Sequence, residues 1–158
     1  MRFFLVLFCL ASSVYSTRAQ ALERVSAREL QQRIQAGGER IRIYNFWATW
    51  CAPCVKEMPL FERYRSAHPE VDLVFVSLDL NLDPDVAKVA RFTQRKKIEA
   101  QVILLDEGDP NSWIDLIEKK WSGALPATLV VNPQNGKRVF NQHEFKEGEL
   151  DAFVALVK

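Results

Sequence analysis

Strand-like and helix-like segments alternate along most of this chain, and this alternation restricts the fold more than any other feature. Residues 41–48, 71–78 and 101–105 are apolar runs rich in β-branched and aromatic side chains, a composition typical of buried strands. Residues 52–67 and 83–97 lie between these runs and have helical patterns. Because strands that alternate with helices form βαβ units, the sequence predicts a parallel sheet covered by helices.

Local signals indicate where several of the expected helices begin. Residues 26–29, Ser-Ala-Arg-Glu, form a capping-box pattern that predicts the start of a first helix. Asp83-Pro84 and Asp109-Pro110 each combine a capping residue with a proline at the first helical position. We expect the helices that follow them to run to about residues 97 and 120.

The last part of the chain predicts a change in strand direction. Asn135-Gly136 lies between strand-like residues 127–131 and 138–141, which indicates an antiparallel hairpin. An amphipathic helix over 147–157 closes the chain. The expected fold class is therefore α/β, with a central mixed β-sheet flanked by helices on both faces.

The first 21 residues have the pattern of an export signal. Arg2 precedes the apolar residues 3–11, and residues 19–21, Ala-Gln-Ala, match a small-x-small cleavage site. The apolar stretch is much shorter than the ~20 residues that a membrane-spanning helix needs. We expect cleavage at this site and one domain over 22–158 in the periplasm or another extracytoplasmic compartment. An uncleaved segment would tether the protein to the membrane, and the remaining alternative is a first helix of the fold.

Cleavage would leave two cysteines in the chain. Cys9 would be removed with the signal, and Cys51 and Cys54 would remain. Two cysteines three positions apart in an oxidising compartment pair with each other.

The net charge of +1, without a basic stripe, gives no indication of nucleic-acid binding. We expect a monomer without a cofactor.

The cysteines lie where the strand over 41–48 gives way to the helix over 52–67. A helix N-terminus exposes unpaired N–H groups and carries about half a positive charge, and both favour a thiolate. Cys51, at the cap, is predicted to attack a substrate disulfide, and Cys54, one turn further, to resolve the mixed disulfide. Pro53 loses no hydrogen bond in the first turn and stiffens it.

Other roles for the cysteine pair stay open from the residues alone. Structural zinc needs four ligands, whereas the remaining candidates, His68 and His143, are far apart in the sequence. A purely structural disulfide across so short a loop would gain little entropy. A copper site needs soft ligands near the pair, and the nearby Met58 fits a core position better. The residues favour redox chemistry over these uses.

Two segments resemble the thioredoxin superfamily. Residues 45–59 read Asn-Phe-Trp-Ala-Thr-Trp-Cys-Ala-Pro-Cys-Val-Lys-Glu-Met-Pro and closely resemble its active-site segment, with 50–59 most similar to the TlpA/ResA branch. Residues 125–129, Leu-Pro-Ala-Thr-Leu, resemble its cis-proline loop. The expected order of elements matches over about 41–157. Two motifs far apart in the chain are more specific than C-x-x-C alone.

The resemblance implies a thioredoxin-like fold and an exported thiol–disulfide oxidoreductase. It implies a disulfide reductase acting on protein dithiols or disulfides, of the type that serves cytochrome c maturation, with a membrane thiol-electron transporter as its reductant. It also implies a cis peptide bond before Pro126. Substrate contacts are expected at Trp50, Pro53, Leu125 and Pro126.

The resemblance also places an acid, Glu57, beside the cysteine pair. Thioredoxin itself has a buried Asp where this chain has Asn45, and an amide cannot take a proton. Glu57 lies one helical turn beyond Cys54 on the same face, which makes it the expected proton-transfer residue. The alternative for Glu57 is a solvated surface side chain.

Three other functions compete with disulfide reduction. A peroxidase of the peroxiredoxin kind shares the fold but needs Thr three residues before its Cys and Pro seven before, where this chain has Ala48 and Tyr44. A periplasmic disulfide oxidase or isomerase would use the same cysteines to form or rearrange substrate disulfides instead of reducing them. A binding module with a structural Cys pair would use no redox chemistry.

Overall fold

The computed structural model describes residues 22–158. The predicted export signal over 1–21 and Cys9 lie outside the described residues. Among the described helices, none has the length and apolar character needed to cross a membrane.

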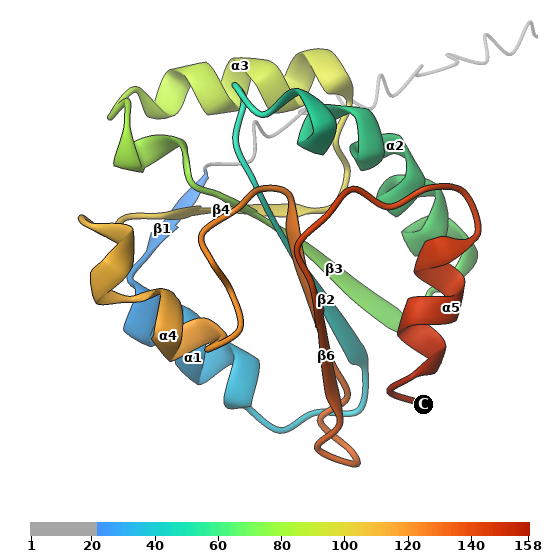
Figure 1. Ribbon diagram of the computed structural model, residues 1–158. Coiled ribbons are helices and arrows are strands. Elements are labelled where there is room, and N and C mark those ends of the chain that lie inside the picture. Colours follow the sequence, from blue (N-terminus) through green and yellow to red (C-terminus); the bar gives the residue numbers. More distant parts are fainter. Residues whose placement is uncertain (1–21) are drawn as a thin grey trace, which may run out of the picture.

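One mixed sheet forms the centre of the described chain (Figure 1). Its six strands are β1 (Glu23–Val25), β2 (Ile41–Trp47), β3 (Val71–Ser77), β4 (Gln101–Leu105), β5 (Ala127–Val131) and β6 (Arg138–Asn141). They lie in the order β1-β4-β3-β2-β5-β6. The first four in this order are mutually parallel, and β5 and β6 add two antiparallel pairings. The predicted mixed α/β sheet with a terminal hairpin is confirmed.

Helices cover both faces of the sheet (Figure 1). They are α1 (Ala27–Gln35), α2 (Ala52–Ala67), α3 (Val86–Lys96), α4 (Ile114–Ile117) and α5 (Glu149–Ala155), with 3₁₀ turns η1 (Asp79–Asn81) and η2 (Pro110–Ser112). Apolar residues of α2, α3 and α5 form one core cluster, and those of α1 and α4 form the other.

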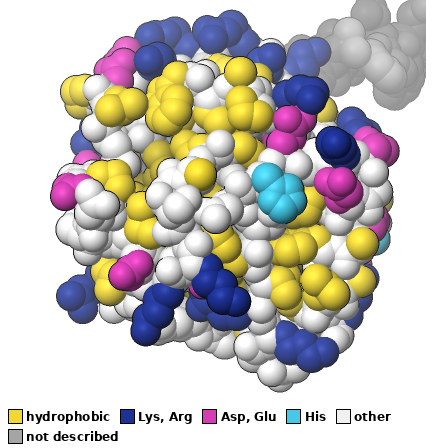
Figure 2. Space-filling view, viewed as in Figure 1, with side chains coloured by type: hydrophobic (Ala, Val, Ile, Leu, Met, Phe, Trp, Pro, Cys, Tyr) yellow, Lys and Arg dark blue, Asp and Glu magenta, His cyan; other side chains and the backbone are white. Residues whose placement is uncertain are grey.

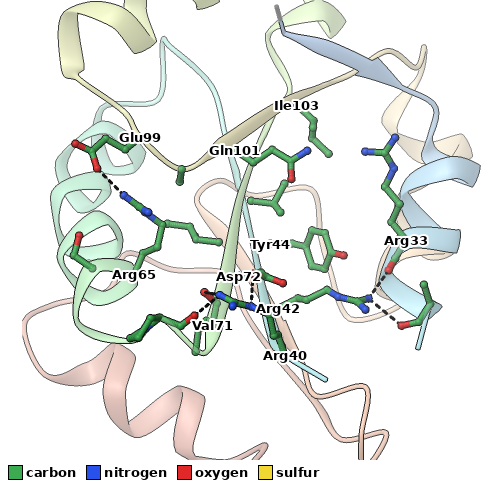
Figure 3. A pocket seen from close by; sticks show the side chains of 16 residues that line it. Arg33, Arg40, Arg42, Tyr44, Arg65, Val71, Asp72, Glu99, Gln101 and Ile103 are labelled. Atoms are coloured by element: carbon green, nitrogen blue, oxygen red, sulfur yellow. Dashed lines mark hydrogen bonds and ion pairs between the residues drawn. The ribbon is translucent and has the colours of Figure 1, made fainter. Parts of the chain in front are cut away.

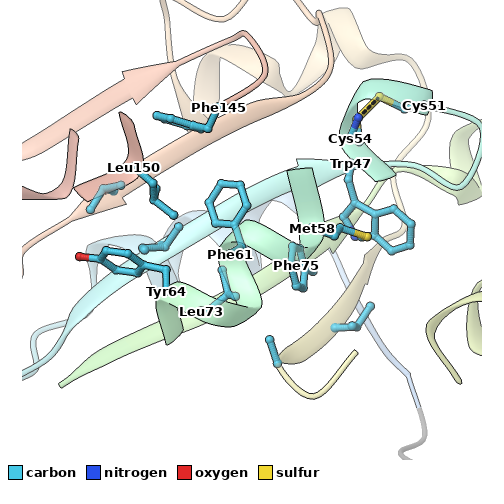
Figure 4. Packing of buried hydrophobic residues seen from close by; sticks show 14 of the residues in the cluster. Trp47, Cys51, Cys54, Met58, Phe61, Tyr64, Leu73, Phe75, Phe145 and Leu150 are labelled. Carbon is cyan, nitrogen blue, oxygen red and sulfur yellow. Dashed lines mark hydrogen bonds between the residues drawn. A yellow bond between two sulfur atoms is a disulfide. The ribbon is translucent and has the colours of Figure 1, made fainter. Parts of the chain in front are cut away.

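Side chains of the central strands point alternately to the two faces of the sheet and so contribute to both core clusters. In β2, Ile43 and Trp47 pack under α2, whereas Tyr44 and Phe46 pack on the opposite face. Because side chains alternate across a strand, an apolar run such as β2 is buried on both faces. Figure 4 shows Trp47 and Phe75 of neighbouring strands beside the side chains of α2.

Three details differ from the sequence-based expectations. Strand β1 was not predicted, and it exists through parallel pairing with β4. The helix expected over 110–120 is only η2 and the four-residue α4, because the buried Trp113 between them leaves helical geometry with φ −134°. Helix α3 is capped by Asp85, whose side chain accepts from the Ala87 N–H, and not by Asp83. The carboxylate of Asp83 accepts from the Asp85 N–H in the preceding turn.

Phe61 offers a test of the core under α2. Its ring is fully buried and makes edge contacts with the rings of Phe75 and Phe145. Phe61→Ala is expected to lower the free energy of unfolding by about 3–5 kcal/mol, since it removes buried area and leaves a cavity. Urea denaturation measures this change. Leu82→Ala is the matched control, because Leu82 is 74% exposed and its truncation should change stability by less than about 0.5 kcal/mol.

Candidate active site

Cys51 and Cys54 lie at the start of α2, just beyond the end of β2. Cys51 is the N-cap of α2, and the Cys54 N–H points at its Sγ with an N–S distance of 3.4 Å. The two sulfurs are joined in a disulfide (Figure 4). Cys51 is 5% exposed and Cys54 is fully buried. The pair therefore presents one edge to solvent, on the Cys51 side.

Trp50 and Pro53 flank Cys51 in the sequence, and Leu125 and Pro126 precede β5 at the same edge of the sheet. Trp50 is 54% exposed and Pro53 is also exposed, on the two sides of Cys51 in the sequence. Leu125 is half-buried and Pro126 is buried, and the peptide bond between them is cis. Figure 2 shows hydrophobic side chains gathered over the end of the molecule where α2 begins in Figure 1. The exposed Trp50 side chain thus contributes apolar surface beside Cys51.

Glu57 is buried on α2, one helical turn beyond Cys54, so the alternative of a solvated side chain is wrong. Its exposed fraction is 2%. One carboxyl oxygen accepts from the Asn45 side-chain amide at 2.8 Å, and the other accepts from the Phe145 N–H at 2.8 Å. Burial raises the pKa of Glu57 from 4.5 to about 7, although the hydrogen bonds from Phe145 and Asn45 oppose the shift. Glu57 is thus an acid that titrates near neutral pH.

Asn45 connects Glu57 to the strand that follows Pro126. Its Nδ2 also donates to the Oγ1 of Thr128 in β5 at 3.1 Å. Its Oδ1 is buried and has no hydrogen-bond partner among the described residues. The amide that stands in place of the thioredoxin Asp therefore holds Glu57 against β5 and has one acceptor unused.

Sequence reasoning missed one acidic residue at this end of the sheet. Asp79 lies in η1, directly after β3, and is 1% exposed. Its carboxylate accepts hydrogen bonds from the N–H and hydroxyl of Thr49, which precedes Trp50. Polar residues at the carboxyl ends of adjacent parallel strands meet at one edge of a sheet, and Asp79 could have been found by this rule.

The described residues do not suggest a metal site. Within residues 22–158, no group of three or more His, Cys, Asp or Glu side chains is placed to hold a metal ion. His68 lies near Glu70 and Asp151, away from the cysteines.

A cavity of about 740 Å³ lies at the opposite end of the parallel strands (Figure 3). Its lining includes Arg33, Arg40, Arg42 and Arg65. Each guanidinium already has partners in the chain. Arg33 bonds Glu23, Arg40 bonds Asp72 and Arg65 bonds Glu99. Arg42 donates to backbone carbonyls at the end of α1. The arginines therefore stabilise strand and helix ends, and the cavity is separate from the cysteine site.

Comparison with known proteins identifies the family. The AhpC/TSA family model matches residues 18–137. Sporulation thiol-disulfide oxidoreductase A of Bacillus subtilis (strain 168) is 32% identical over 91 residues, which are 57% of this chain and 52% of that protein. Thiol-disulfide oxidoreductase ResA of Halalkalibacterium halodurans is 25% identical over 114 residues, which are 72% of this chain and 60% of that protein. The chain thus matches little more than half the length of these relatives.

A solved structure agrees with the fold. The thioredoxin-related protein from Neisseria meningitidis serogroup B superposes with a TM-score of 0.65 and 28% identity, covering 78% of this chain and 88% of that one. The AhpC/TSA match spans most of the chain, and the superposition covers most of both chains. This chain therefore belongs to the AhpC/TSA family and has a thioredoxin-like fold.

Proposed function

We propose that this protein is a thiol–disulfide oxidoreductase that reduces disulfides of protein substrates outside the cytoplasm. The observation that carries the proposal is the Cys51–Cys54 disulfide at the N-cap of α2, with Cys51 at the exposed edge. The names of the two curated relatives, both thiol-disulfide oxidoreductases, support the same reaction class.

The proposed reaction begins from the reduced pair. The Cys51 thiolate attacks one sulfur of the substrate disulfide, and the other substrate sulfur leaves as a thiolate and takes a proton. Cys54 then loses its proton and attacks the Cys51 sulfur, which releases the second substrate thiol and forms the Cys51–Cys54 disulfide. The substrate gains two electrons and two protons, and the enzyme loses both. A dithiol reductant must return them before the next cycle.

Glu57 is proposed to move the proton of Cys54. It lies three residues after Cys54 on α2, so both side chains lie on one face of the helix. An acid whose pKa is about 7 can both accept and donate a proton at neutral pH. Asn45 and the Phe145 N–H hold the carboxyl group in place for this transfer.

Trp50, Pro53, Leu125 and Pro126 are proposed to contact the substrate. Trp50 and Pro53 lie beside Cys51 in the sequence, Leu125 and Pro126 precede β5 at the same edge of the sheet, and all four are apolar side chains that suit an extended, partly apolar polypeptide. The export pattern over 1–21 supports an extracytoplasmic location, where electrons would come from a membrane thiol-electron transporter. The resemblance suggests that the substrates are proteins that take part in cytochrome c maturation.

Peroxide reduction is the less favoured activity for this family member. The residues that the peroxiredoxin site requires before its cysteine are replaced by Tyr44 and Ala48, and both side chains are buried in the strand and turn. Ala48, at the position of the required Thr, has no hydroxyl to donate a hydrogen bond.

Cysteine substitutions test the order of attack. Insulin reduction, followed by turbidity with dithiothreitol as reductant, should be lost in both Cys51→Ser and Cys54→Ser. Cys54→Ser should accumulate a mixed disulfide with the substrate, because the attacking thiol remains and the resolving thiol is gone. Non-reducing gels and mass spectrometry detect this adduct. Accumulation in Cys51→Ser instead would reverse the assignment, and insulin reduction absent from the wild-type protein would refute the function.

The raised pKa of Glu57 predicts how the free energy of unfolding depends on pH. Because the folded-state pKa of about 7 is above 4.5, the native protein holds a proton that the unfolded chain releases between these values. The free energy of unfolding of the disulfide form should therefore fall as the pH rises from about 4.5 to 7, by on the order of 3 kcal/mol. Glu57→Gln should remove this fall, because Gln does not titrate.

Urea denaturation across this pH range measures the effect of Glu57. Glu147→Gln is the control, because the Glu147 side chain is 80% exposed and its loss should leave the pH dependence in place. A Glu57→Gln profile that still falls like the wild-type profile would show that another group titrates.

The direction of the reaction predicts a reducing potential. A strongly oxidising pair needs its thiolate stabilised by added charge or donors, as in DsbA at about −120 mV against about −270 mV for thioredoxin. Ala52 and Pro53 supply neither, and the buried Glu57 opposes further negative charge. Equilibration with glutathione buffers should give a potential more negative than about −180 mV. A less negative value would favour the oxidase or isomerase alternative.

A further inference from the structure

Asp79 is a buried acid that the proposed reaction does not use. It is 1% exposed and lies in η1, immediately beyond the end of β3. Among residues 22–158, no Lys, Arg or His side chain pairs with its carboxylate, which is absent from all twelve ion pairs of this region. Burying an unpaired carboxylate is costly unless hydrogen bonds compensate. The donors that meet Asp79 therefore indicate its role.

Most of these hydrogen bonds come from one residue. The Thr49 N–H lies 3.0 Å from one carboxylate oxygen and 3.2 Å from the other, and the Thr49 hydroxyl donates to the carboxylate as well. The Ser77 hydroxyl donates from the end of β3 at 2.8 Å. Asp79 thus binds both polar hydrogens of Thr49.

Thr49 belongs to the turn that carries the redox pair. It is followed directly by Trp50 and then by Cys51, and the Cys51 N–H donates to the Ala48 carbonyl at 3.1 Å. One residue earlier, the Trp47 carbonyl accepts from the Leu78 N–H at 2.8 Å. The turn is tied to the β3–η1 segment through Trp47 and Thr49. The hydrogen bonds that Thr49 donates from its N–H and its hydroxyl all end on Asp79.

We propose that Asp79 is a positioning residue for disulfide exchange, acting through Thr49 to hold the Trp50–Cys51 segment in its attacking geometry. The inference rests on the proposed function and names a residue that this function did not assign. Trp50 is half exposed, with little packing of its own to fix the segment. A nucleophile displaced by about 1 Å can lose up to about 10²-fold in rate, so a loosened Thr49 should affect chemistry more than substrate binding.

The test compares Thr49→Val with Thr49→Ser. Valine has nearly the shape of threonine but lacks the hydroxyl donor, whereas serine keeps it. With insulin as substrate, Thr49→Val should lower kcat by about tenfold with KM changed less than about threefold, and Thr49→Ser should restore kcat to within about threefold of wild type. Asp79→Asn should lower kcat at least as much as Thr49→Val, because it replaces one of the two accepting oxygens by an NH2 group that cannot accept from Thr49 or Ser77.

A remote threonine controls for simple loss of stability. Thr93 in α3 is 9% exposed, and its hydroxyl donates to the Ala90 carbonyl at 2.9 Å. Thr93→Val should keep wild-type kcat and KM, with urea denaturation confirming that every variant is folded at the assay temperature. A folded Thr49→Val with wild-type kcat, a Thr49→Ser as slow as Thr49→Val, or a Thr93→Val equally slow would each overturn the inference. If Asp79→Asn does not fold, the two Thr49 variants decide. An inactive wild-type protein would instead refute the proposed function.

Discussion

The double pairing of strand β2 determines where the site is built. Trp47, the last residue of β2, pairs with Ser77 of the parallel strand β3, and Phe46 pairs with Ala127 of the antiparallel strand β5. The carboxyl ends of β2 and β3 and the amino end of β5 therefore meet at one edge of the sheet. The cysteine turn, the 3₁₀ turn η1 and the Leu125–Pro126 segment all leave the sheet at this edge. No single stretch of sequence contains the site, because the pairing of these three strands assembles it.

Buried polar groups near this edge form two separate hydrogen-bond networks. On the α2 side, the Asn45 amide joins Glu57 to Thr128 of β5. Beyond β3, Asp79 binds the donors of Thr49. A buried polar group destabilises the fold unless it is hydrogen-bonded, so each network requires the strands and turns to keep their relative positions. The first holds a titratable group one turn of α2 beyond Cys54, and the second binds the turn that precedes Cys51.

Local patterns predicted most of this architecture, and the errors lie where contacts between residues far apart in the sequence determine the local structure. The apolar runs were sufficient for β2 to β5, since each is buried on both faces. Strand β1 has only three residues and forms through its pairing with β4, which no local signal indicates. The motif predicted the cap position of Cys51. The buried Glu57, in contrast, accepts a hydrogen bond from the Phe145 N–H, 88 residues further along the chain, and no local pattern indicates this contact. Asp79 has no local signal of its own, because its contact with Thr49 arises from the parallel pairing of β3 with β2.

The two cysteines need opposite protonation in the proposed reaction, and the site supplies opposite environments. The N-terminus of α2 favours negative charge at Cys51 through its unpaired N–H groups. Glu57, one turn deeper, disfavours a second negative charge near Cys54 whenever it is ionised itself. Because burial raises the pKa of Glu57 to about 7, small changes in its surroundings change its protonation at neutral pH. Groups whose environments separate their protonation in this way divide into nucleophile and proton carrier. Because Asn45 cannot titrate, Glu57 is the residue that we propose for the second role.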